Sequence, residues 1–232
     1  MVPLRDNNPT TITPYVTYGL FAANIAVFIF QLSLSEPQLE GFFQIAAMVP
    51  RELSGGSCPR SFFAQPIPEW ATLFTSQFLH GGFLHIAGHM LFLWIFGNNI
   101  EDRLGHVKFL FFYLTCGALA ALAQWFFSQG SCIPSLGASG AIAGVMGAYI
   151  LRFPHAKVLT LVPLGFFLTT FQLPAYLFLG FWFLQQAFFS FASLGVRTNV
   201  GMESGGIAYW AHAGGFVVGA VLGPMLGLMR RD

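Results

Sequence analysis

Charged residues are scarce in this chain. Asp, Glu, Lys and Arg together make up 8% of its 232 residues, whereas an average soluble domain has about 25%. A soluble protein of this length could not cover its surface with so few charges, and 55% of the residues are hydrophobic. The composition therefore excludes a soluble or disordered protein and indicates an integral membrane protein.

Other residues and features that are scarce exclude further classes of protein. The net charge is +1 without a basic cluster, which excludes a nucleic-acid-binding protein. Three cysteines are too few for a disulfide scaffold. The apolar runs are long and unbroken, so they favour membrane helices over the short alternating strands of a barrel.

The expected fold class is an all-α membrane protein, a bundle of six transmembrane helices. Each span needs about 20 residues. A short N-terminal segment, residues 1–14, precedes the membrane domain, residues 15–232. The stretch 158–173 is apolar but contains Pro163, and we expect an interfacial loop or hairpin there. The six spans are expected near 15–34, 83–100, 107–128, 138–152, 174–193 and 207–229.

Basic residues orient the predicted bundle. Six spans that start inside place seven of the ten basic residues in the cytoplasm and three outside, which is the positive-inside bias. Both termini are then cytoplasmic, and the loops near 45–80, 129–137 and 194–206 face out. Cys58 and Cys132 lie in two of these loops, where an oxidising compartment could join them, although the sequence fixes no distance between them.

Acidic residues are missing from the expected spans. None of the nine carboxylates falls inside one. Ionisable groups within a membrane usually mark function. Their absence therefore argues against an intramembrane aspartyl protease and weakens an ion-coupled transporter.

Histidine and serine residues, unlike the carboxylates, do fall inside the expected spans. His85 and His89 lie four residues apart at the outer start of the second span, so they share a helix face. His212 lies about one turn into the sixth span, and Ser139 opens the fourth. A zinc site is not expected, because the intramembrane zinc motif also needs a glutamate. Taken singly, the serine could be a helix cap and each histidine a packing hydrogen-bond donor, but all four are expected at one depth.

Small residues surround this polar level. The fourth span has glycines beside and below Ser139, and the sixth has a glycine stripe that begins next to His212. Such stripes let two helices approach closely, which would bring His212 towards Ser139. Helix packing alone would explain the glycines, but not a serine and a histidine at the ends of both stripes. A helix start also offers free N–H groups to an oxyanion. The helix-packing glycines are Gly137, Gly140, Gly144, Gly215 and Gly219.

The combined motifs resemble the rhomboid intramembrane serine proteases. They are FLHGGFLH at 78–85, E-x-R-x-G at 101–105, G-x-S-G at 137–140 and A-H-x-x-G-x-x-x-G at 211–219. The resemblance implies that Ser139 is the nucleophile, that His212 is the general base and that His85 stabilises the oxyanion. It implies a Ser–His dyad without metal or cofactor.

The resemblance also implies partners and a location. Substrates would be single-pass or other membrane proteins, cut at or near the outer end of a transmembrane segment after approaching through the lipid bilayer beside the fifth span. The compact six-helix form resembles bacterial members, which implies a cell (inner) membrane. The alternative function is a catalytically silent relative that binds membrane clients.

Two positions depart from the family pattern. His89 replaces a frequent asparagine; it could serve as an oxyanion donor or as a tether for the first outer loop. Ala143 replaces a frequent tyrosine that stacks on the catalytic histidine. The sequence therefore does not show what orients His212.

Overall fold

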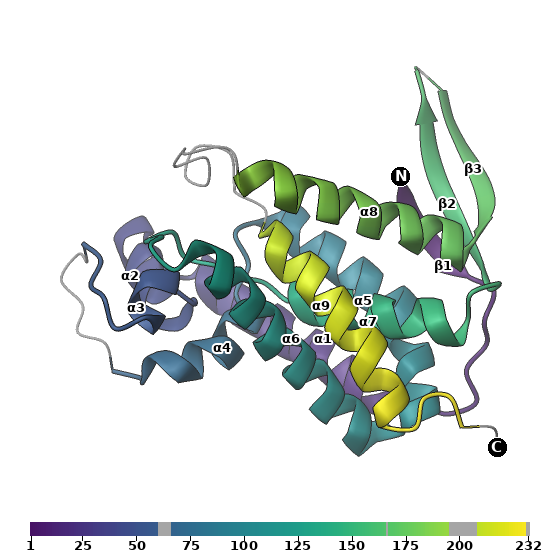
Figure 1. The fold of residues 1–232 in the computed structure, drawn as a ribbon, viewed down its shortest axis with the longest axis horizontal. Helices are drawn as coiled ribbons and strands as arrows, with labels where there is room; N and C mark the ends of the chain where they lie inside the picture. Colours follow the sequence, from purple (N-terminus) through teal and green to yellow (C-terminus); the bar gives the residue numbers. More distant parts are fainter. Residues whose placement is uncertain (60–65, 166, 195–207, 231–232) are drawn as a thin grey trace.

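The structure, a computed structural model, describes residues 1–59, 66–165, 167–194 and 208–230. It consists of a helix bundle with short helices at one end and a three-stranded sheet at the other (Figure 1). The long helices are α1 (Tyr15–Leu32), α5 (Phe83–Leu104), α6 (His106–Ser128), α7 (Ser139–Arg152), α8 (Ala175–Leu194) and α9 (Tyr209–Met225). The short ones are α2 (Glu36–Ala46), α3 (Pro50–Leu53), α4 (Thr72–Thr75) and the 3₁₀ turns Glu69–Ala71 and Ser76–Phe78.

Among the residues that the structure describes, four helices are long and apolar enough to cross a membrane: α1, α5, α6 and α8. The other two expected spans correspond to α7 and α9, which have 14 and 17 residues. At about 1.5 Å per residue, α7 is shorter than a hydrocarbon core of about 30 Å. Most of α7 is buried against α5, α6 and α9, so its surroundings are protein rather than lipid.

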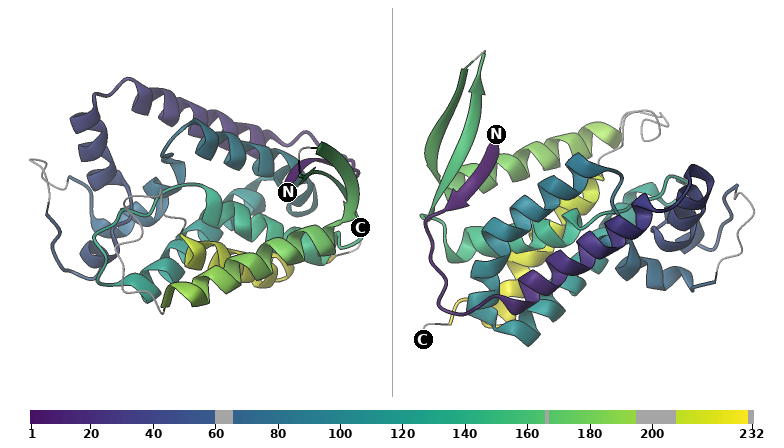
Figure 2. Two further views of the ribbon diagram at one scale, coloured as in Figure 1. Left: turned by 90° about the horizontal axis from the view of Figure 1, so that it is seen from above. Right: turned by 180° about the vertical axis from the view of Figure 1, so that it is seen from behind.

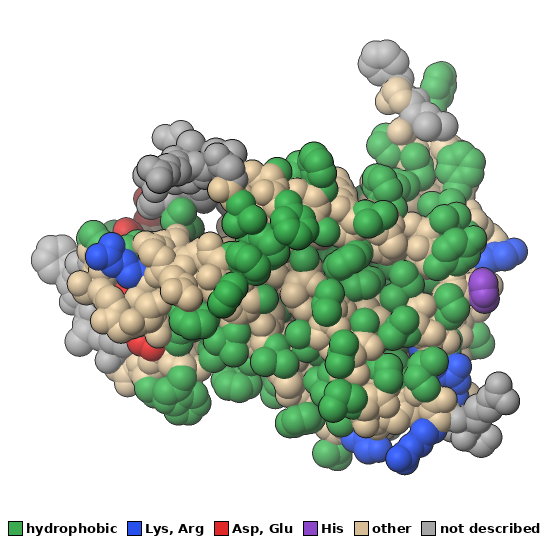
Figure 3. Space-filling model, viewed as in Figure 1, with side chains coloured by type: hydrophobic (Ala, Val, Ile, Leu, Met, Phe, Trp, Pro, Cys, Tyr) green, Lys and Arg blue, Asp and Glu red, His purple; other side chains and the backbone are tan. Residues whose placement is uncertain are grey.

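The outer surface of the bundle is apolar. Figure 3 shows hydrophobic side chains spread across the middle of one face, with the charged side chains towards the two ends. Phe188 and Leu184 on α8 and Val221 on α9 are more than half exposed. A soluble monomer rarely exposes so large an apolar area. This belt is therefore suited to contact with lipid.

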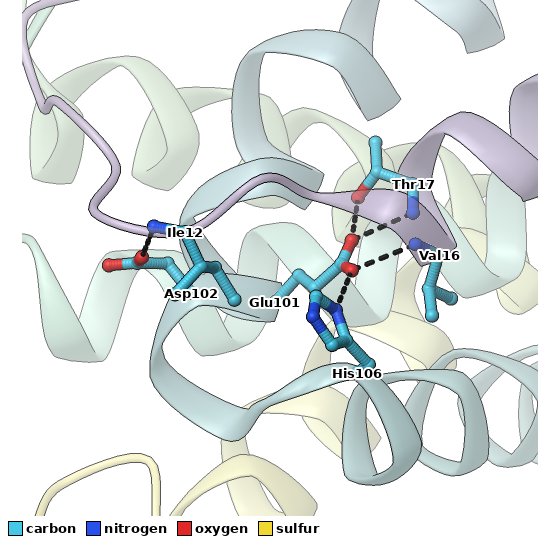
Figure 4. A network of polar contacts seen from close by, with 6 residues as sticks. All are labelled: Ile12, Val16, Thr17, Glu101, Asp102 and His106. Carbon is cyan, nitrogen blue, oxygen red and sulfur yellow. Dashed lines mark hydrogen bonds and ion pairs between the residues drawn. The ribbon is translucent and has the colours of Figure 1, made fainter.

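The expectation that no carboxylate lies within a membrane helix is wrong for Glu101, which is part of α5. The second span was expected to end at residue 100, but α5 continues to Leu104, and Glu101, whose polar contacts Figure 4 shows, is fully buried. Its carboxylate accepts hydrogen bonds from the backbone N–H groups of Val16 and Thr17, at 2.8 and 2.7 Å, and contacts His106 Nδ1 at 2.6 Å. The first N–H groups of a helix lack partners within it, so Glu101 caps α1 from another helix.

The apolar stretch after α7 is a hairpin, as expected. Strand β2 (Lys157–Leu164) pairs antiparallel with β3 (Phe167–Pro174), with Gly165 at positive φ in the turn. The hairpin projects beyond α8, away from the helices (Figures 1 and 2). The N-terminal segment contributes β1 (Val2–Asp6), which the sequence did not predict, and the strand order is β1-β2-β3.

Asp6 fastens this sheet to the helices. Its carboxylate accepts hydrogen bonds from the Tyr149 hydroxyl at 2.5 Å and from Asn99 Nδ2 at 3.0 Å. Burial raises the pKa of Asp6 above its ordinary value. The sheet and the C-terminal ends of α5 and α7 therefore meet around one partly buried carboxyl group.

A disulfide joins the loops at the opposite end. Cys58 and Cys132 are bonded, a pairing that the sequence left open. Met48, between α2 and α3, and Ser135, in the loop that contains Cys132, form a β-bridge. The segment that leads into Ser139 is thus held against the loop that follows α2.

Candidate active site

Ser139 is the first residue of α7. Gly137, two residues earlier, has a φ of +119°, a conformation that favours glycine and allows the sharp turn into the helix. Ser139 lines a cavity of about 20 Å³ together with Ser76, Gln77 and Ala211. The hydroxyl therefore lies at a helix N-terminus, beside free N–H groups and next to a small cavity.

Close contact between α7 and α9 brings His212 to the same level. A Cβ atom on Gly215 would overlap the carbonyl oxygen of Gly140, and one on Gly140 would lie 3.8 Å from the carbonyl oxygen of Ala211. The residue after Ser139 thus packs against the residue before His212. Gln124 of α6 accepts a hydrogen bond from the Ala211 N–H at 3.3 Å, which helps to fix the start of α9.

His85 and His89 lie against the segment that precedes Ser139. A Cβ atom on Gly137 would lie 3.1 Å from His85 Nε2 and 2.9 Å from His89 Cε1. The two rings are 4.3 Å apart between centroids. The structure therefore brings both histidines of α5 to the N-terminal end of α7.

The hydrogen bonding of His85 specifies its tautomer. Gly81 N–H donates to His85 Nδ1 at 3.2 Å. A nitrogen that accepts carries no proton, so neutral His85 has its proton on Nε2. Nε2 is also the ring nitrogen of His85 that lies nearest Gly137. Its N–H is therefore suited to donate a hydrogen bond to negative charge that develops beside Ser139.

His80 belongs to this cluster but was missed as a site residue by the sequence analysis. Its Nε2 lies 2.9 Å from His89 Nδ1, and its backbone N–H and carbonyl are hydrogen-bonded to the Gln31 side chain. Burial lowers the pKa of His80 to about 4, so the ring is neutral at pH 7. His80 lies in a loop, where no helical spacing links it to His89; only its place in the FLHGGFLH motif pointed to it.

Two residues of α8 contact the His212 ring. His212 Nδ1 lies 2.8 Å from Gln186 Oε1, and the Trp182 ring centroid is 5.7 Å from that of His212. The sequence analysis missed both residues. The available signal was the pair of glutamines at 185 and 186 in a largely apolar helix. In the described part of the chain, no three His, Cys, Asp or Glu residues are grouped so as to hold a metal ion.

Comparisons with known proteins identify relatives of this chain. A family model for the rhomboid domain matches residues 68–228. The chain is 28% identical over 215 residues to Rhomboid protein 1, mitochondrial, of Saccharomyces cerevisiae, covering 90% of this chain and 52% of that protein. It is 40% identical over 95 residues to Rhomboid protease GluP of Bacillus subtilis, covering 41% of this chain and 18% of GluP.

A third relative is Presenilin-associated rhomboid-like protein A, mitochondrial, of Danio rerio. It is 36% identical over 85 residues, covering 36% of this chain and 22% of that protein. The chain thus spans about half the length of the yeast protein and less than a quarter of the other two. The family model covers well over half of the chain and includes Ser139, His212 and both histidines of α5. The chain belongs to the rhomboid family.

Proposed function

We propose that this protein is an intramembrane serine endopeptidase that cleaves membrane-anchored proteins, single-pass or other, at or near their transmembrane segments. Ser139 is the nucleophile and His212 the general base. The observation that carries the proposal is the contact of Gly140 with Ala211 and Gly215, because it sets the serine and the histidine at the same end of two tightly packed helices.

The proposed chemistry is acyl transfer through a dyad. His212 Nε2 takes the Ser139 proton as the hydroxyl oxygen attacks the peptide carbonyl, and it returns that proton to the leaving amine. The ester that remains on Ser139 is then hydrolysed by water. Negative charge on the tetrahedral carbonyl oxygen is stabilised by the Ser139 N–H and by His85 Nε2–H. No step requires a metal or a cofactor.

His89 has two candidate roles in this proposal. Its contact with Gly137 keeps it beside the expected oxyanion, which supports a role as a second donor. Its hydrogen bond with His80 supports a role in holding the loop before α5, because His80 is in turn bonded to Gln31 of α1. Variants that separate the two roles are described in the Discussion.

The proposed topology has both termini in the cytoplasm, six spans and a site that faces the outer side of a bacterial cell (inner) membrane. The Cys58–Cys132 bond supports this orientation, since it lies at the Ser139 end of the bundle and disulfides persist in oxidising compartments. The bacterial relative GluP is compatible with that membrane, and the yeast and zebrafish relatives make a mitochondrial membrane the alternative.

A reporter protein with one transmembrane segment tests the proposal. Wild-type protein in liposomes is expected to cleave it, and Ser139→Ala is expected not to, while Ser33→Ala at the exposed end of α1 serves as the matched control. A fluorophosphonate should label wild-type protein, with the modified peptide containing Ser139 rather than Ser76 or Ser135 of the same cavity. Client binding without cleavage or labelling would favour the silent relative.

A further inference from the structure

We propose that Gln186 of α8 is the positioning residue for His212; this rests on the proposed protease function. An amide oxygen can only accept a hydrogen bond. The contact between Gln186 Oε1 and His212 Nδ1, at 2.8 Å, therefore requires the imidazole to carry its proton on Nδ1. The lone pair is then on Nε2, which is the form that a general base needs.

The contacts that orient the His212 ring come from α8 rather than from α7. The position four residues after Ser139 is Ala143, so α7 has no ring there to hold the imidazole. Trp182, one turn before Gln186, places its ring beside His212 at a tilt of 35°. A hydrogen bond and an aromatic contact from one helix together fix the tautomer and the plane of the base.

The burial of Gln186 argues that this contact is specific. Its side chain is 8% exposed, whereas most of α8 faces outward. A polar group taken out of water costs free energy unless it is hydrogen-bonded, and an apolar residue would suit lipid or helix packing at lower cost. The glutamine therefore has a partner that requires its oxygen, and that partner is His212.

The arrangement makes the base depend on the docking of α8. Of the long apolar helices, α8 is the least buried in the protein. In its most apolar 18-residue stretch 22% is buried, against 44% in the corresponding stretches of α5 and α6. If α8 moves away from α9, the hydrogen bond breaks and the imidazole is free to rotate. The dyad is therefore aligned only while α8 lies against α9.

Purified full-length protein in liposomes tests the proposal with three variants and the transmembrane reporter. Gln186→Leu has a similar volume but no acceptor, and Gln186→Glu keeps an acceptor oxygen. Ser190→Ala is the control, since Ser190 lies one turn further along the buried face of α8 and donates to the Gln186 backbone carbonyl. Gln186→Leu should lower kcat roughly 10- to 100-fold at nearly unchanged KM, the scale of a misplaced reacting group. Gln186→Glu should recover most of that loss, and Ser190→Ala should stay near wild type.

Nitrogen-15 NMR of the histidine rings provides a readout that does not depend on activity. The His212 signal, assigned by its absence in His212→Asn, should report the Nδ1–H tautomer in wild type and Gln186→Glu, and a mixture in Gln186→Leu. The proposal is overturned if Gln186→Leu keeps wild-type kcat, or if kcat and melting temperature fall together without rescue by glutamate. An absence of Ser139-dependent cleavage in wild type would refute the proposed protease, whereas an unchanged tautomer in Gln186→Leu would refute the positioning role alone.

Discussion

Gly219 of α9 lies directly against the carbonyl group of Gly144 of α7. A Cβ atom built on Gly219 would overlap that carbonyl oxygen, and one built on Gly147 would overlap the carbonyl oxygen of Phe216. The two helices therefore meet backbone to backbone along much of α7. Because Ser139 and His212 are at one end of this contact, the spacing of the helices sets the spacing of the proposed dyad.

Gly215→Leu should abolish most of the proposed protease activity without changing a reacting group. The leucine side chain must displace the Gly140 carbonyl, which lies beside Ser139. A misplacement of about 1 Å can cost roughly 100-fold in rate. Cleavage of the reporter and fluorophosphonate labelling should both fall on that scale. Gly180→Ala on α8, where a Cβ atom meets open space, is the control; full activity in Gly215→Leu would show that this contact does not set the dyad.

His80→Ala and His89→Ala should each lower the melting temperature in detergent, and the double variant should add little to either. Both remove the same buried hydrogen bond, so the two losses are coupled, by about 1 kcal/mol. Additive losses would mean that the two rings act independently. A different outcome marks His89 as an oxyanion donor: about 100- to 1,000-fold lower turnover for His89→Ala at unchanged melting temperature, recovered in His89→Asn.

Glu101→Gln should destabilise the fold while leaving the proposed dyad chemically intact. The substitution replaces an ionised acceptor that caps α1 with a neutral amide, whose NH₂ group faces other donors. Loss of hydrogen bonds to a charged group costs about 1.5–3 kcal/mol. Chemical unfolding in detergent should show a loss of that size. Asp102→Asn, at the partly exposed neighbouring position, keeps an acceptor oxygen for Thr11 and Ile12 and should cost about 1 kcal/mol or less, so equal losses would contradict the capping role.

Removal of the Cys58–Cys132 disulfide should loosen the loops at the Ser139 end. Cys58 and Cys132 are 74 positions apart in the chain, and bridges of this kind typically contribute about 2–4 kcal/mol. Cys58→Ser should therefore melt earlier than wild type under oxidising conditions and like wild type once reductant is added. A difference that persists in reductant would assign the effect to the serine itself. After reduction, a thiol reagent that cannot cross membranes should label both cysteines only from the outer side.

Asp6 should make the fold less stable as the pH rises. Burial raises the folded-state pKa of its carboxyl group above the usual 3.8, so the folded protein holds this proton more tightly than the unfolded chain does. The stabilisation is complete below the unfolded value and is lost as the pH rises through the folded pKa. Asp6→Asn keeps an acceptor for the Tyr149 hydroxyl but does not titrate. Relative to this variant, wild type should lose stability as the pH rises above the usual carboxyl pKa of 3.8; parallel curves would contradict the shift.

The sequence predicted those parts of the molecule that repeat at short range. Helix positions follow from apolar runs, and the close packing of α7 on α9 follows from glycines four residues apart. The hairpin follows from an apolar stretch interrupted by Pro163 and bounded by Pro174. Each of these signals lies within one segment, so no knowledge of distant contacts was needed.

Contacts between distant segments could not be predicted in this way. Gln186 of α8 contacts His212 of α9, and His80 in a loop contacts His89 of α5. Glu101 contacts Thr17, which lies 84 positions away in the chain. No periodicity relates the members of these pairs. From the sequence, Glu101 is expected in a loop, because burying a carboxylate costs free energy. In the folded bundle that cost is offset by N–H groups at the start of α1, which the sequence around Glu101 does not reveal.

Strand β1 pairs with residues that follow it by about 150 positions. Val2 lies opposite Leu161 and Asp6 opposite Val158. While the chain is being synthesised, residues 2–6 must therefore wait as an unpaired strand until α1, α5, α6 and α7 have been made and β2 has followed them. Residues 2–6 are thus made before β2 and reach their final place only after it, and the sheet closes only on a bundle that already contains the Ser139 helix.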